Sequence, residues 1–85
     1  MIRINYTSNR TVINSGKAKR FKITPRTYID NECEYLKSFF LWIPNKAIIK
    51  SDDCGVEVKD WYLNISNDLK SAINNYKECE IITKL

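Results

Sequence analysis

The chain contains no histidine, and this absence removes much of the chemistry that small enzymes use. Histidine is the most common general acid–base residue, it activates cysteine nucleophiles, and it is a ligand in most zinc sites. The sequence also lacks a glycine-rich phosphate loop and a recognisable nucleophile motif. The adjacent acids Asp52 and Asp53 precede Gly55 in a predicted turn, where aspartate suits the backbone. We therefore expect no enzymatic activity, no cofactor and no metal.

Glycine and proline are scarce, with two of each in 85 residues. Long flexible linkers are therefore not expected, and a chain this short supports only one hydrophobic core. Cys33, Cys54 and Cys79 are odd in number and widely spaced, whereas a small secreted domain normally carries an even set. We predict one domain over residues 1–85 with three reduced thiols.

Long apolar runs are also missing, since the longest covers only residues 39–43 and is far too short to span a membrane. The first ten residues, MIRINYTSNR, alternate apolar and polar side chains and lack the apolar core of a signal peptide. Together with the cysteine pattern, this predicts a cytoplasmic protein with no membrane partner.

Acidic residues are absent from the first 29 positions, although the whole chain carries ten of them. This segment has a charge of +7, whereas residues 30–85 sum to −3. Such a basic end attracts nucleic acid or an acidic protein surface. The candidate contact residues are its seven basic side chains and one tyrosine: Arg3, Arg10, Lys17, Lys19, Arg20, Lys22, Arg26 and Tyr28.

Residues 2–6 and 20–24 each alternate apolar and polar side chains, which is the period of a half-buried strand. Arg3 lies on the polar side of the first strand, and Arg20 and Lys22 lie on the polar side of the second. If both strands turn their apolar side to the core, these three basic residues share the outer face of one sheet.

The segment FFLWIP contains the densest apolar run in the chain. Residues 35–43 fit a strand, and both faces of that strand are apolar from Phe39 onward. This pattern is typical of a strand in the middle of a sheet that is covered on both sides. Pro44 and Asn45 then predict a turn. We interpret the aromatic run as core and not as a binding surface.

Later segments complete the predicted fold. Within residues 26–34, Asp30-Asn31-Glu32 fits a turn or short helical loop, and the alternation of residues 56–65 fits a strand that continues past Asp60. Residues 66–78 have apolar side chains at the spacing of one helical face. The predicted fold class is α+β and mostly β: a small antiparallel curved sheet or half-open barrel of five to seven short strands, with one helix at about 66–78.

Two stretches, Trp42–Ala47 and Val56–Leu63, together resemble a pattern of short phage and prophage proteins of unassigned function. Trp42–Ala47 (WIPNKA) is similar to their W-[IL]-P-K-S-like turn, and Val56–Leu63 (VEVKDWYL) is similar to the V-x-V-P-x-W-[IL] strand that follows. The sequence departs from the pattern at Asn45, Lys46 and Lys59, and the likeness covers about a quarter of the chain. The resemblance implies an origin in a mobile element and transfers no functional residue.

These features favour a non-enzymatic binding protein of a phage or mobile element that acts in the host cytosol. Its most concrete form is an anti-CRISPR-like inhibitor, which occupies a surface of a host protein or nucleoprotein complex that handles nucleic acid or provides defence. One alternative is an accessory protein of phage replication or recombination, whose basic segment 1–29 binds DNA or RNA directly. Another is a structural or virion-assembly component. The partner and the oligomeric state stay open.

Overall fold

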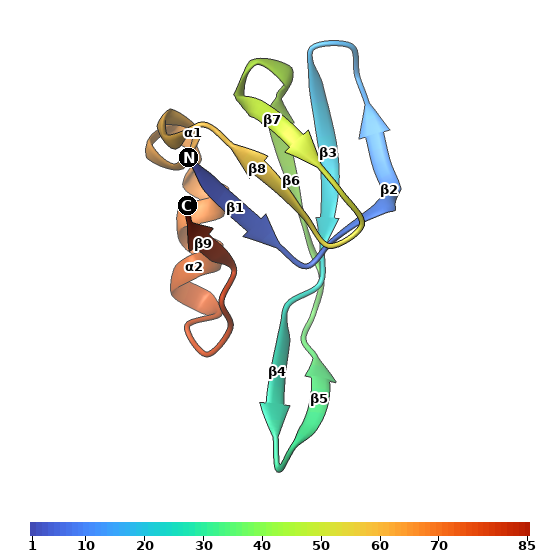
Figure 1. Cartoon of the computed structure of the whole chain (residues 1–85), viewed down its shortest axis with the longest axis vertical. Coiled ribbons are helices and arrows are strands. Elements are labelled where there is room, and N and C mark those ends of the chain that lie inside the picture. Colours follow the sequence, from blue (N-terminus) through green and yellow to red (C-terminus); the bar gives the residue numbers. More distant parts are fainter.

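The computed structural model describes the backbone of residues 1–85 and the side chains of residues 1–7 and 13–85. Along this backbone nine short strands, two α-helices and one 3-10 helix follow one another (Figure 1). The fold is α+β and mostly β, as expected, with one main helix. The strands outnumber the five to seven predicted, and their small antiparallel sheets do not close into a barrel.

The first sheet has four strands in the order β7-β8-β1-β9. They are β1 (Ile2–Asn5), β7 (Ile48–Ser51), β8 (Gly55–Val58) and β9 (Ile82–Lys84). β1 is antiparallel to β8 on one side and to β9 on the other. This sheet therefore joins the start, the middle and the end of the chain, and its inner face is apolar and buried at Ile2, Ile4, Val56 and Val58.

The second sheet has three strands in the order β2-β3-β6. They are β2 (Thr7–Asn14), β3 (Ala18–Ile23) and β6 (Phe39–Pro44). Four buried side chains, Phe21, Ile23, Leu41 and Ile43, belong to the same core cluster as the inner residues of the first sheet. Because side chains alternate along a strand, the neighbouring residues of β3 and β6 point to the other face.

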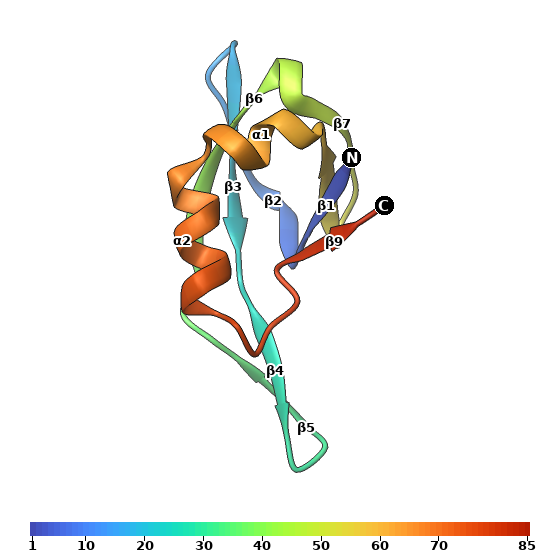
Figure 2. The ribbon, with the colours of Figure 1, turned by 90° about the vertical axis from the view of Figure 1, so that its left-hand side faces the viewer.

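The helix α2 (Asn67–Asn75) extends the layer that contains the second sheet, and α1 (Asp60–Ile65) lies across one end of the core, between the two sheets (Figure 2). α2 lies beside β6, and both are set apart from β1 and β9 (Figure 2). The rings of Phe39 and Tyr76 stack with centroids 5.7 Å apart, and the Tyr62 hydroxyl donates to the Trp42 carbonyl at 2.8 Å. None of the helices in the described chain is both long and apolar enough to cross a bilayer.

The predicted helix is confirmed as α2, although it is shorter than residues 66–78. Ser66 caps it, because its hydroxyl oxygen accepts a hydrogen bond from the Leu69 N–H at 3.2 Å. The predicted strand continuation at residues 61–65 is wrong, because this segment forms α1. A strand would have buried the odd-numbered residues, including Trp61 and Ile65. In α1 these two side chains are exposed, and Tyr62 is buried instead.

The prediction that β6 is covered on both faces is wrong. Leu41 and Ile43 are buried, whereas Phe40 and Trp42 are 48% and 47% exposed. A chain of 85 residues has too little material for a third layer, so the outer face of the second sheet is uncovered. The predicted turn after β6 is present, and it takes the form of the 3-10 helix η1 (Asn45–Ala47).

Residues 26–35 form a β-hairpin, and its turn at Asp30 and Asn31 falls within the turn predicted at 30–32. Its strands are β4 (Arg26–Ile29) and β5 (Glu32–Tyr35), so the single strand predicted at 35–43 is divided between β5 and β6. Asp30 and Asn31 have φ angles of 51° and 66°, as the two central residues of a type I′ turn require. This hairpin projects from the body of the molecule (Figures 1 and 2).

Gly55, the first residue of β8, lies in close contact with the β1 backbone. A Cβ atom added at Gly55 would lie 2.7 Å from the Ile4 carbonyl oxygen and 3.0 Å from the Arg3 guanidinium. We expect Gly55→Ala to destabilise the protein by about 1–3 kcal/mol, because the β1 backbone must shift. Urea unfolding measures this cost. Ser51→Ala, at an exposed position in β7, is the control and should change stability by less than about 0.5 kcal/mol.

Candidate functional site

The structure does not bring all the predicted contact residues into one patch. Arg3 lies in the first sheet, while Lys19, Arg20 and Lys22 lie in β3 of the second. Lys17 lies in the turn before β3, and the hairpin carries Arg26 and Tyr28. The side chain of Arg10 lies outside the described residues. The prediction that Arg3 shares one sheet face with Arg20 and Lys22 is therefore wrong.

Arg3 is held in an ion-pair network on the outer side of the first sheet. Its Nη2 lies 2.8 Å and 2.9 Å from the two carboxylate oxygens of Asp52, and its Nη1 lies 3.6 Å from Glu57 Oε2. Lys50 also reaches Glu57, at 3.2 Å. The hydrogen bond from Arg3 holds the pKa of Asp52 down, at about 2, with backbone donors adding to the effect. Because these carboxylates already occupy it, Arg3 is poorly suited to contact a phosphate.

The three basic residues of β3 divide between the two faces of the second sheet. Lys19 is opposite Ile43, a core residue, so it shares the parity of the inner face. Arg20 and Lys22 have the other parity and lie on the outer face, opposite Trp42 and Phe40 respectively. Arg20 and Lys22 therefore lie together with two aromatic rings on one face of the second sheet.

Arg20 makes the closest contact on this outer face. Its guanidinium carbon lies 4.3 Å from the centroid of the Phe40 ring, which is a cation–π geometry. The Nε atom of Arg20 is buried and has no hydrogen-bond partner among the described residues. Packing against Phe40 thus fixes the guanidinium beside the ring instead of leaving it free in solvent.

The outer face has no negative charge of its own. None of the strands β2, β3 and β6 contains Asp or Glu. Ile13 on β2 is opposite Arg20 and is exposed, which adds an aliphatic side chain. We call this surface the basic–aromatic face, and it consists of Ile13, Arg20, Lys22, Phe40 and Trp42.

Sequence reasoning missed the aromatic half of this face. It assigned Phe40 and Trp42 to the core, since a strand that is apolar on both sides is normally covered on both sides. The available signal was chain length, because one late helix cannot cover both a sheet face and a sheet edge. In the structure the helices take the edge of β6, where Tyr62 donates to the Trp42 carbonyl.

A groove borders the basic–aromatic face where β6 meets α2. Its volume is about 290 Å³, and it is lined by Phe39, Phe40, Asp68, Ser71, Ala72, Asn75 and Tyr76. The Phe40 ring thus belongs both to the face and to the groove. The arrangement offers stacking surfaces, cations and hydrogen-bonding groups, which suit binding.

The remaining predicted residues lie elsewhere. The guanidinium carbon of Arg26 lies 4.8 Å from the centroid of the Tyr6 ring, at the base of the hairpin. Burial raises the pKa of Tyr6. Tyr28 lies further out on the hairpin and is 70% exposed. Lys17 is exposed beside Gly16, whose carbonyl accepts a hydrogen bond from Asn45.

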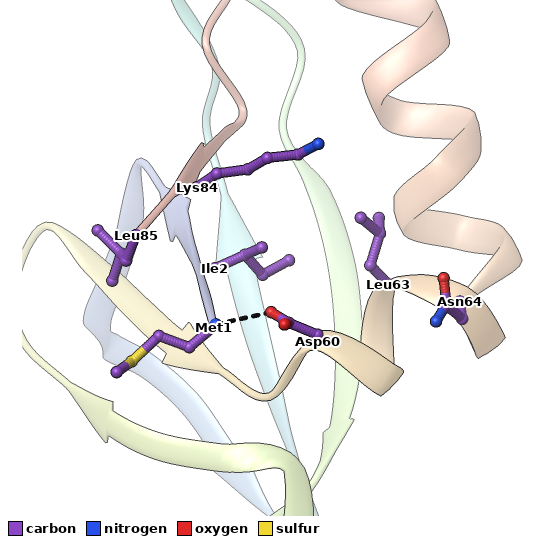
Figure 3. Close-up of a pocket in the computed structure, with 7 residues that line it drawn as sticks. All are labelled: Met1, Ile2, Asp60, Leu63, Asn64, Lys84 and Leu85. Carbon is purple, nitrogen blue, oxygen red and sulfur yellow. Dashed lines mark ion pairs between the residues drawn. The ribbon is translucent and has the colours of Figure 1, made fainter.

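A separate pocket of about 300 Å³ lies where the two ends of the chain meet (Figure 3). The amino group of Met1 lies 2.7 Å from Asp60 Oδ1, and Ile2, Leu63 and Leu85 supply apolar side chains. This pocket contains none of the predicted contact residues.

The cysteines and acids do not assemble into a recognisable centre. Cys33 and Cys54 are exposed, Cys79 is buried, and all three are free thiols. Burial raises the pKa of the Cys79 thiol, which lowers its reactivity. Within residues 1–7 and 13–85, no three His, Cys, Asp or Glu side chains gather where they could hold a metal ion.

Comparisons with known protein families, with curated proteins and with solved structures find no match for this chain. The candidate site is therefore defined by its geometry alone.

The Arg3–Asp52 pair makes stability depend on acid pH. The folded-state pKa of Asp52, about 2, lies below the ordinary value of 3.8, so ionised Asp52 favours the folded state. This contribution is complete above the ordinary value and is lost as the pH falls through about 2. Asp52→Asn keeps an oxygen that accepts from the Cys54 and Gly55 N–H groups but loses the charge. Its melting temperature should be below that of the parent at pH 7.

Thermal unfolding from neutral to acid pH measures this difference. We expect the gap between the two proteins to close as the pH approaches about 2. Because the pair is partly solvent-exposed, salt should also narrow the gap at neutral pH. A gap that stays constant at every pH would show that the amide change acts on packing and not through charge.

Proposed function

We propose that this protein binds single-stranded nucleic acid on the basic–aromatic face and performs no chemistry of its own. One observation carries the proposal: each exposed ring of β6 has a cation directly across the strand pair. Trp42 is opposite Arg20, and Phe40 is opposite Lys22. Rings of this kind stack on bases at about 1–3 kcal/mol per base, and neighbouring cations attract the phosphates.

The spacing on β6 suits consecutive bases of an extended strand. Phe40 and Trp42 are two residues apart on one face, and a strand rises about 3.3 Å per residue. Their side chains therefore leave the sheet about 7 Å apart. Arg20, whose guanidinium lies over the Phe40 ring, adds a fixed cation to this surface.

The same geometry favours a single strand over a duplex. Bases inside a duplex are stacked on one another and do not present their ring faces to a protein. Reading a duplex commonly places a helix in the major groove, and the exposed residues of α2 include both Asp68 and Lys70. The described chain therefore offers a stacking surface and not a basic recognition helix.

The resemblance to phage proteins fits this activity as well as it fits inhibition. An inhibitor of a host complex could place the same face on an acidic protein surface. A host lysate passed over the immobilised protein, with and without nuclease, separates the two hypotheses. Retention of one host protein after complete nuclease treatment, with no affinity for oligonucleotides, would favour the inhibitor.

Removing a ring should weaken oligonucleotide binding. We expect Phe40→Ala or Trp42→Ala to lower affinity for a labelled oligothymidine by about 5- to 150-fold, which is the loss of one stacked base. Fluorescence anisotropy at low salt measures the affinity. Trp61→Ala is the matched control, because Trp61 is a partly exposed tryptophan on α1, outside the face. Equal losses in the control and the two face variants would contradict the proposed site.

Removing the positive charges of Arg20 and Lys22 should make oligonucleotide affinity less sensitive to salt. Log K for a single strand falls with log salt, and each phosphate contact adds about 0.7 to the steepness of this fall. Arg20→Gln with Lys22→Gln should therefore reduce the slope by about 1.4. Lys46→Gln with Lys70→Gln, at exposed positions outside the face, should leave it nearly unchanged. No binding of DNA or RNA even at about 50 mM salt would overturn the proposed function.

A further inference from the structure

The β4–β5 hairpin carries the most exposed aromatic side chains of the described chain. Tyr28 is 70% exposed, Tyr35 is 67% exposed and Ile29 is 52% exposed. The hairpin occupies one end of the longest axis, which measures 41 Å (Figure 1). A two-stranded hairpin is at best marginally stable alone, so this projecting ribbon gains stability if a partner covers either of its faces.

The register of the hairpin sorts its side chains into two unlike faces. Cross-strand partners share a face, and these partners are Arg26 with Tyr35, Tyr28 with Cys33, Thr27 with Glu34, and Ile29 with Glu32. Alternation places the first two pairs on one face and the last two on the other. We call the second one the acidic ribbon face, and it consists of Thr27, Ile29, Glu32 and Glu34.

The acidic ribbon face and the basic–aromatic face have complementary charges. Glu32 and Glu34 are exposed, and neither forms an ion pair among the described side chains. Asp30, at the turn, adds a third negative charge at the same end. Arg20 and Lys22 lie in a sheet whose strands contain no acid.

The two faces also match in spacing. Glu32 and Glu34 are two residues apart on one strand, and so are Arg20 and Lys22. In both strands this separation is about 7 Å, so two ion pairs can form at the same time. The exposed aliphatic side chain of Ile29 lies beside Glu32 and would meet an apolar part of the opposite face.

We propose that the acidic ribbon face of one molecule docks on the basic–aromatic face of a second copy. The projecting hairpin can reach outward to another molecule (Figure 2). Two hairpins do not dock on each other through this face, because Glu32 and Glu34 would meet like charges. The contact joins unlike surfaces, so it is heterologous and builds chains or rings. The proposal does not rest on the proposed nucleic-acid binding, although a docked hairpin would occupy the same face.

Sedimentation equilibrium of nuclease-treated protein, from micromolar to millimolar concentration at low salt, tests the contact. The parent protein should self-associate, and added salt should weaken this association. One variant carries Glu32→Lys and Glu34→Lys, and the other carries Arg20→Glu and Lys22→Glu. Each alone should associate at least about tenfold more weakly, because like charges then face each other.

Sedimentation of an equimolar mixture of the two variants is the decisive experiment. Each hairpin then meets a face of opposite charge, so association should return. Lys46→Glu with Lys77→Glu is the control for altered net charge, at exposed positions outside both faces, and it should associate like the parent. Circular dichroism melting shows whether each variant is folded.

Several outcomes would overturn the docking. They are a parent that is monomeric at all concentrations, a hairpin variant that associates like the parent, and folded variants whose mixture stays monomeric. Oligonucleotide titration below the association range measures nucleic-acid binding separately. A protein that binds oligonucleotide as a monomer but never self-associates would therefore disprove the docking and leave the proposed function standing.

Discussion

β3 and β6 pair in an antiparallel register that places Phe21 opposite Leu41 and Arg20 opposite Trp42. Since side chains alternate along both strands, this single register assigns the core and the outer face together. A slip by one residue would turn Arg20 toward the first sheet and expose Phe21. The burial of Phe21 and Leu41 in the core therefore also holds the basic–aromatic face in place.

The small size of the chain explains why this face is available. Two sheets enclose one core, and the two helices are used along the edge of β6 and over the end of the core. Tyr62 of α1 contributes to both places, because its ring is buried in the core while its hydroxyl donates to the Trp42 carbonyl of β6. No layer covers the outer side of the second sheet in the described chain. The rings of Phe40 and Trp42 are exposed because the short chain that the structure describes has no further element to cover them.

The arginines of the two sheets have different partners. In the first, Arg3 of β1 is neutralised locally by Glu57 of β8 and by Asp52, which lies in the turn between β7 and β8. In the second, Arg20 is held by an uncharged ring, which keeps its positive charge uncompensated. The net charge of the first 29 residues therefore overstates the basic surface, because residues distant in sequence cancel part of it. The acids of the hairpin are set apart at the far end of the molecule.

Sequence alone determined the features that depend on local periodicity and composition. The helical spacing of apolar side chains in residues 66–78 predicted the main helix, and strand alternation predicted the mostly β class. Arg20 and Lys22 were likewise predicted to share an outer face. Only the tertiary structure decided what covers each face: it placed Arg3 against Asp52 and left Trp42 uncovered. The reason is that burial and ion pairing depend on contacts between segments far apart in the chain, which no local pattern specifies.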